Sequence, residues 1–420
     1  MATVRWRGDA PAIKQVDTLT PANVEIGDIF TATINGKSIS FTATAATVAN
    51  VTAGLADAIN DNDDSIPEFS EVTATDDTTL VTVTADGAGK PFTMTASATD
   101  GGGTDTQTLS QATSTSATGP NHWSEADNWD GGSVPVNSDD VYIDQGSSDI
   151  LYGLDQSAVT LTSLSITQNY TGKIGLPEVN GDDPGNVYFE YRDTYLKIKS
   201  TTVTIGSGDG NGSGRIKLDG STAQTTLNVL NSGQAAEAGI PSILWKGTHA
   251  SNVANIMRGS VGAAFFSGET ATVATLRVGY VENPAGDSRV VCGAGVTLTN
   301  VDQSGGTLKI DSATTTFDQT DGQSTILSGA HAELNIDGGS CFYRSTGTIT
   351  TARVGGGAEL DFGRDMRSRT VTNCELHARG TMLDPFKTAT FTNGIDVTRS
   401  NLGDVTLDLG THLTVTRSAI

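Results

Sequence analysis

The sequence contains few of the residues that build disulfide, metal or membrane structures. Its 420 residues include three cysteines, Cys292, Cys341 and Cys374, which have neither Cys-x-x-Cys nor Cys/His zinc spacing. Aromatic residues make up 6% of the chain, and no apolar run reaches the length that a membrane-spanning helix needs. The opening residues turn polar almost at once, unlike an export signal. We therefore expect no disulfide framework, no membrane insertion, and synthesis in a cytoplasm.

Positive charge is also scarce. The chain has 25 basic and 48 acidic residues, and its formal net charge is −23. Such a surface repels nucleic acid phosphates and anionic membranes, so nucleic acid is not an expected partner. The motifs HExxH and GxSxG, and the common phosphate-binding loops, are absent from the sequence as well. These absences argue against several familiar enzyme classes.

Glycine, serine and threonine are abundant, and this composition favours many short strands and turns. Asn35-Gly36 is the preferred dipeptide of a two-residue type I′ turn, which predicts a hairpin around it. The register places four apolar residues on one face: Phe30, Ala32, Ile39 and Phe41. Thr47 is a candidate N-cap, and the stripe Val48, Val51, Leu55 and Ile59 predicts an amphipathic helix that covers this hairpin.

Further alternating segments follow the helix. They begin at Val72 and Val81, and a third contains Phe92, Met94 and Ala96. We predict that residues 18–99 form one small ββαββ module, preceded by an N-terminal arm over residues 1–17. Residues 100–120 are polar and have little to bury, so they are expected to form a linker or an extended strand-like arm.

Residues 121–420 have the pattern of a β-solenoid similar to a parallel β-helix. Leu308, Leu334 and Leu360 recur at intervals of 26 residues, and each begins an apolar-x-apolar segment. At the start of this region, residues 121–145 contain Trp123 and Trp129, a Gly-Gly turn and a short strand. This segment resembles the entry of β-helical stalks in bacterial surface and adhesin-like proteins. The tryptophans are interpreted as an apolar lid on the first coil, and the alternative is a platform that stacks on sugars.

Catalysis has one set of candidates. Glu375, His377 and Arg379 alternate on one face of an expected strand, and parallel β-helices include polysaccharide lyases and hydrolases. Polar residues on such an outer face are usually solvated, so we predict no catalytic site. The glycine-rich loop at 206–214 contains one carboxylate, Asp209, which is too few for a calcium site. No cofactor or metal is predicted, and calcium binding at acidic loops is left open.

The first hundred residues resemble an N-terminal module of virion structural proteins of tailed bacteriophages. The residues that match include Gly27-Asp28, the turn Ile34-Asn35-Gly36, Leu55 and Ile59, and the turn and strand from Ala85 to Phe92. The resemblance implies a non-catalytic protein that is assembled in the host cytoplasm and located in the virion, as a capsid decoration or a tail or fibre component. It also implies major capsid or tail proteins as partners, and a homotrimer.

Attachment would use the N-terminal strand with Val4 and Trp6, because an extended apolar terminus can add to a neighbour's sheet edge. Two alternatives remain open. A bacterial surface adhesin would need an export signal, and a β-helical glycan-binding or glycan-cleaving protein would need a groove with clustered acids, bases and aromatic residues. A host-surface glycan therefore stays on the list of partners.

Overall fold

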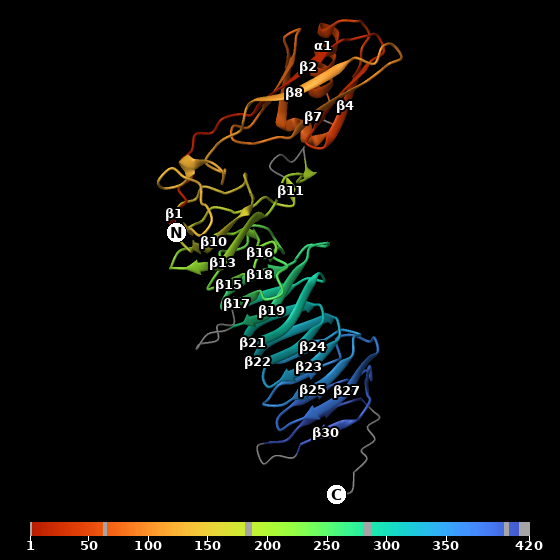
Figure 1. The fold of residues 1–420 in the computed structure, drawn as a ribbon. Helices are drawn as coiled ribbons and strands as arrows, with labels where there is room; N and C mark the ends of the chain where they lie inside the picture. The colour runs from red at the N-terminus through yellow and green to blue at the C-terminus, as the bar shows by residue number, and fades with distance from the viewer. Residues whose placement is uncertain (1, 62–64, 181–186, 280–287, 399–402, 411–420) are drawn as a thin grey trace.

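The computed structural model describes residues 2–61, 65–180, 187–279, 288–398 and 403–410, and the chain is mainly β, as predicted (Figure 1). A small N-terminal module lies at one end of an elongated body of stacked parallel strands (Figure 1). Among the described residues, no helix has both the length and the apolar character needed to cross a membrane.

The N-terminal module has one α-helix and two antiparallel sheets. Its elements are β2 (Val16–Ala22), β3 (Ile29–Ile34), β4 (Lys37–Thr42), α1 (Val48–Asn60), the 3₁₀ helix η1 (Pro67–Glu71), β5 (Val72–Asp76), β6 (Val81–Ala85), β7 (Met94–Thr99) and β8 (Thr108–Thr115). One sheet has the order β5-β6-β2-β8, and the other has the order β4-β3-β7. The two sheets and α1 share one hydrophobic core.

The predicted hairpin and helix are present. In the hairpin of β3 and β4, Phe30 pairs with Phe41 and Ala32 with Ile39, which is the predicted register. The Thr47 side chain accepts a hydrogen bond from the backbone N–H of Asn50 and caps α1. The apolar stripe of the helix packs inward, and its buried members include Val51, Leu55 and Ile59.

The larger arrangement differs from the predicted ββαββ module over residues 18–99. The strand that contains Met94 pairs with β3 and not with β6, because Met94 and Ala96 lie opposite Ile34 and Ala32 and extend that buried face. Residues 100–120, for which a linker or an extended strand-like arm is predicted, include the strand β8, and β8 pairs along β2 within the module. Leu109 on β8 is buried, and this single apolar anchor lies within an otherwise polar sequence.

Gly36 provides a direct test of the hairpin turn. Its φ is +77°, and a Cβ added there would have no atom within 4 Å, so a side chain would add backbone strain without a clash. We expect Gly36→Ala to lower the free energy of unfolding of the module by about 1–2 kcal/mol, measured by urea denaturation. Gly36→Asn should lose less, because asparagine tolerates positive φ. Equal losses in the two variants would contradict this explanation.

Apart from the antiparallel pair of β11 and β12, the body consists of parallel strands that pair mostly with the strand of the next coil, which is consistent with the expected β-helix-like fold. Its elements are β1 (Thr3–Arg5), the 3₁₀ helix η2 (Ala126–Asn128), β9 (Asp140–Ile143), β10 (Asp155–Thr167), β11 (Val179–Asn180), β12 (Tyr188–Phe189), β13 (Leu196–Ser207), β14 (Ile216–Asp219), β15 (Thr226–Val229), β16 (Ile243–Lys246), β17 (Val253–Ile256), β18 (Gly259–Ala263), β19 (Ala271–Val278), β20 (Ser288–Cys292), β21 (Val296–Asp311), β22 (Thr314–Ser328), β23 (His331–Ile336), β24 (Ser340–Tyr343), β25 (Ile349–Val354), β26 (Glu359–Asp361), β27 (Arg369–Leu376), β28 (Thr381–Leu383), β29 (Ala389–Phe391), β30 (Ile395–Val397) and β31 (Thr406–Asp408). Buried apolar side chains stack from coil to coil, and Val141, Leu164, Val203 and Leu227 are one such column.

The predicted interval of 26 residues is not the coil length. Leu308 pairs with Ser324, whereas Leu334 pairs with Phe317, so the two leucines belong to different columns. Stacked partners lie 25 residues apart between Leu276 and Val301 but 17 apart between Phe317 and Leu334. Coil length varies because strand pairing determines only which strands lie side by side. The segments that connect the strands can differ in length from one coil to the next.

His331 makes the core of the body sensitive to acid. It is 1% exposed, and its Nδ1 lies 2.7 Å from the Thr314 hydroxyl. Burial lowers the pKa of His331 from 6.5 to about 4. The unfolded chain therefore binds the proton more tightly, and stability should fall as the pH drops from about 6.5 to 4, by on the order of 3 kcal/mol. Urea unfolding at pH 7 and at pH 4.5 gives the loss of unfolding free energy on acidification. This loss should be smaller for His331→Gln than for the wild type, and an equal loss would show that His331 is not the acid-sensitive group.

Candidate functional site

The four residues that were singled out from the sequence lie together at the end of the body nearest the module. Trp6 and Trp129 make an edge-on contact with ring centroids 5.0 Å apart, and Trp123 and Trp129 make another at 4.6 Å. Trp129 Nε1 donates a hydrogen bond to the backbone carbonyl of Trp123 at 2.8 Å. Trp123 and Trp129 are 0% and 2% exposed, so their rings cover the first coil and present no free face to a sugar.

Val4 and Trp6 were expected to add to a neighbour's sheet edge, and in this structure they add to an edge of their own chain. Val4 pairs in parallel with Val141 of β9, and Trp6 forms a bridge with Trp129. They are 8% and 1% exposed. Burying these side chains on the first coil removes them from the surface that a partner could reach, which corrects the expectation of an external attachment strand.

The path of the chain inserts the module into the body. Strand β1 precedes the module and β9 follows it, yet the two strands are paired. The two connecting segments also meet, because Ile13 and Thr118 form an antiparallel bridge. His122, just after the second connection, lies 2.8 Å from the carbonyl oxygen of Gly89 in the module. The module is thus held by both ends of its insertion.

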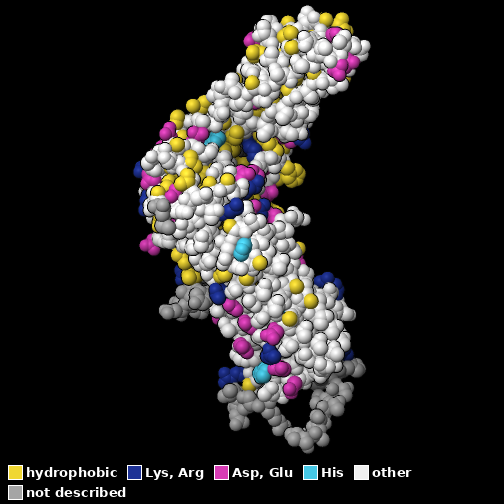
Figure 2. Space-filling view, in the orientation of Figure 1, with side chains coloured by type: hydrophobic (Ala, Val, Ile, Leu, Met, Phe, Trp, Pro, Cys, Tyr) yellow, Lys and Arg dark blue, Asp and Glu magenta, His cyan; other side chains and the backbone are white. Residues whose placement is uncertain are grey.

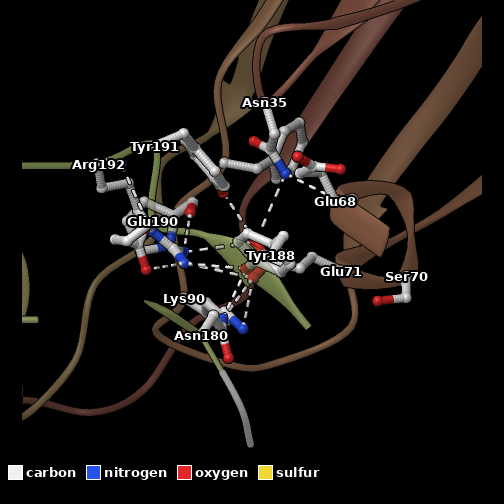
Figure 3. Close-up of polar contacts among 12 residues, drawn as sticks. Asn35, Glu68, Ser70, Glu71, Lys90, Asn180, Tyr188, Glu190, Tyr191 and Arg192 are labelled. Atoms are coloured by element: carbon white, nitrogen blue, oxygen red, sulfur yellow. Dashed lines mark hydrogen bonds and ion pairs between the residues drawn. The ribbon is translucent and has the colours of Figure 1, made fainter. Parts of the chain in front are cut away.

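A third tie is a buried polar cluster between the module and the body, which we call the joint (Figure 3). Its centre is Glu71 at the end of η1, whose side chain is 5% exposed. Lys90 Nζ lies 2.6 Å from the Glu71 carboxylate, and the Tyr191 hydroxyl donates to it at 2.7 Å. Arg192 of the body approaches the same carboxylate at 3.3 Å. One module carboxylate thus binds groups from both parts of the chain.

Arg192 is held from several sides. Its Nε donates to Glu190 at 2.7 Å, and its Nη1 donates to the carbonyl oxygen of Pro91 at 3.1 Å. Burial by itself would lower the pKa of Arg192. The hydrogen bond to Glu190, together with the nearby Tyr191 and Glu71, has the larger effect, so the pKa of Arg192 is raised. Burial also raises the pKa of Tyr191 well above its usual range. The tyrosine therefore stays a neutral donor, and the arginine stays charged.

A cleft beside the joint has two adjacent parts, which share three lining residues. The larger part has a volume of about 430 Å³, and the smaller has about 150 Å³. Leu151, Tyr152 and Arg192 line both parts. The larger part is otherwise lined by Pro91, Thr93, Gly153, Leu154, Asp155, Tyr191 and Asp193. The smaller part is otherwise lined by Lys90, Asp149, Lys173, Leu176, Pro177, Asn180, Glu190 and Arg215. The cleft thus combines aromatic faces with charged groups of both signs.

The three candidates for catalysis lie elsewhere, towards the other end of the body. Glu375 on β27 accepts a hydrogen bond from Arg353 at 3.2 Å, and its carboxylate lies 3.3 Å from His377 Nε2. Arg353 also donates to Asn335 on the preceding coil. Glu375 therefore belongs to a ladder of polar side chains that links successive coils. Asp209 is exposed, and the described residues contain no group of three or more potential metal ligands.

Sequence reasoning missed the joint and its cleft. Glu71 and Arg192 are 121 residues apart, and neither lies in a motif. Lys217 was missed as well, although it is 1% exposed, donates to the carbonyl oxygen of Leu176 at 3.0 Å and pairs with Glu178. Burial and the bond to Glu178 act on the pKa of Lys217 in opposite directions, and burial prevails, so the pKa is lowered. No local pattern marks these residues, because their partners come from distant coils.

Comparisons with known proteins identify no relative. No protein-family model matches the chain, and neither the curated proteins nor the solved structures that were searched include a match.

Proposed function

We propose that this chain is a non-catalytic structural protein of a tailed bacteriophage particle, in which the body projects as a rigid appendage. The observation that supports the proposal best is the construction of the end that faces the module. There the chain pairs its own β1 with β9 and covers the first coil with three tryptophans. A stack of parallel strands whose end is closed in this way avoids edge-to-edge association.

The module would attach the chain to the particle, with a major capsid or tail protein as its partner. The outer face of its β3–β4 hairpin is covered by small hydroxyl side chains that bond to one another. Thr31 and Ser40 are 2.8 Å apart, and Thr33 and Ser38 are 2.7 Å apart. Figure 2 shows a module surface with few charged side chains compared with the body. A surface with few charges and many small hydroxyl groups suits a protein partner better than a charged ligand. A homotrimer remains part of the proposal through the family resemblance.

The experiment is cryo-electron microscopy of phage particles from a lysate that contains the chain, with mass spectrometry of the purified particles. We expect the chain at symmetric positions, with residues 16–115 in contact with the particle and the body pointing outward. Absence of the chain from particles would overturn the proposal. Particles that carry it with the body bound and the module free would overturn the assignment of the module as the attachment unit.

A second candidate function, glycan binding, is favoured by the cleft of the joint. That cleft contains aromatic, acidic and basic side chains, a mixture that can bind both the rings and the polar groups of a glycan.

A further inference from the structure

We infer that the cleft of the joint binds an oligosaccharide that carries an acidic group. Its larger part would hold a sugar ring, and its smaller part would hold the carboxylate. The inference relies on the proposed function only for the source of the ligand, a host surface, and the binding chemistry follows from the residues that line the cleft.

The larger part has the character of a sugar subsite. Tyr152 and Tyr191 line it and are both partly exposed, and the Arg192 guanidinium lies over both rings, 5.6 Å and 4.6 Å from their centroids. The part of each ring that Arg192 leaves exposed can contact the apolar face of a pyranose. The exposed carboxylates of Asp155 and Asp193 lie in the same lining and can accept hydrogen bonds from sugar hydroxyls. A volume of about 430 Å³ falls within the usual range of ligand pockets.

The smaller part brings four basic side chains together in a strongly acidic chain. Two acids, Asp149 and Glu190, face four bases in its lining. The four bases are Lys90, Lys173, Arg192 and Arg215. Glu71 and Glu237 are not part of this lining, but Glu71 pairs with Lys90 and Arg192, and Glu237 pairs with Arg215. Among the described residues, Lys173 is the one base of the lining that is in no ion pair. Lys173 is therefore the base of this lining that is available to a carboxylate of a ligand.

The groups that would contact the ligand are already held in place. Arg192 is fixed by Glu190 and Glu71 (Figure 3). It also donates a hydrogen bond to the carbonyl oxygen of Pro91. Tyr191 is fixed through its hydroxyl by Glu71 (Figure 3). A preformed site loses less conformational entropy when the ligand binds, so such a cleft can bind a small ligand without rearrangement. Lys173 differs from these groups because it is exposed at the mouth, which makes it a suitable residue to test.

The experiment measures binding of the full chain to hexamers of galacturonate, mannuronate and sialic acid by isothermal titration calorimetry. Each hexamer is paired with its carboxyl-reduced neutral counterpart. We expect at least one acidic hexamer to bind, and its carboxyl reduction to weaken binding about tenfold or more, because the charge-assisted bonds to the bases are lost. Lys173→Ala should weaken binding of the acidic hexamer by a similar factor and leave the affinity for its neutral counterpart unchanged. Tyr152→Ala should weaken binding of both forms.

The control is Lys309→Ala, which removes an exposed lysine from β21, outside the cleft lining, and should change neither affinity. Melting curves for each variant report whether the fold is kept.

Failure of all three acidic hexamers to bind, or equal binding of the acidic and neutral forms, would overturn the inference. An effect of Lys309→Ala equal to that of Lys173→Ala would overturn it as well. A chain that is absent from particles but binds the ligand would overturn the virion proposal alone. A chain that is present on particles but binds none would overturn the glycan site alone.

Discussion

Replacing Trp129 by alanine should lower the free energy of unfolding of the body by about 3–5 kcal/mol, the usual cost of removing a large buried aromatic side chain. Trp129 is 2% exposed and contacts both other tryptophans of the cap. Its loss would leave a cavity on the first coil and remove the ring that holds Trp6, so β1 should separate from β9 more often. Urea unfolding followed by far-ultraviolet circular dichroism measures the loss, and hydrogen exchange at Val4 and Val141 reports the release of β1.

The matched control for this prediction is Phe189→Ala. Phe189 is 82% exposed, so its removal leaves no cavity and should change the stability by less than about 0.5 kcal/mol. If Trp129→Ala were as stable as Phe189→Ala, the cap would not hold the first coil, and the interpretation of the tryptophans as a lid would have to be abandoned.

The second large effect is expected at Glu71. Glu71→Ala leaves the Arg192 side chain, which is 9% exposed, without one of its two carboxylate partners. Removing one member of a buried ion pair strands the other charge, and we expect a loss of about 3 kcal/mol. Glu190 still binds Arg192 and limits the loss. Because the cluster joins the module to the body, the variant should also show faster hydrogen exchange and proteolysis at the connections near Ile13 and Thr118.

A double-mutant cycle separates the ion pair from other effects. Arg192→Met in the Glu71→Ala background removes the stranded charge, so the double variant should be less destabilised than the sum of the single variants. Arg367→Ala is the control, since the Arg367 side chain is 60% exposed in its pair with Asp365, and its removal should leave the stability nearly unchanged. Strict additivity in the cycle would show that Glu71 and Arg192 do not act together.

Local features could be predicted from the sequence because short-range chemistry decides them. Asn35-Gly36 specifies the turn, and the turn specifies which residues of β3 and β4 face the core. The cap of α1 and its buried stripe also follow from a few adjacent residues. The mainly β composition of the chain is visible in its glycine, threonine and serine content, and the burial of Trp123 and Trp129 agrees with the lid that was inferred from their position.

The predictions that needed a distant partner were the ones that failed. Leu308 and Leu334 have equivalent surroundings in the sequence, but their columns differ because the lengths of the connections vary between coils. Trp6 has the sequence of an exposed arm, yet it is buried because the module is inserted between β1 and β9 and returns the chain to the same end of the body.

The sequence by itself determined the turn at Asn35-Gly36, the helix after Thr47 and the strand-rich character of the chain, since each depends on the conformational preferences of neighbouring residues. Only the tertiary structure decided the coil register, the pairing of β1 and the joint of Glu71 with Arg192. These depend on which distant segments meet. A buried charge is stable only where an opposite charge contacts it, and a local sequence pattern cannot predict a contact between distant residues.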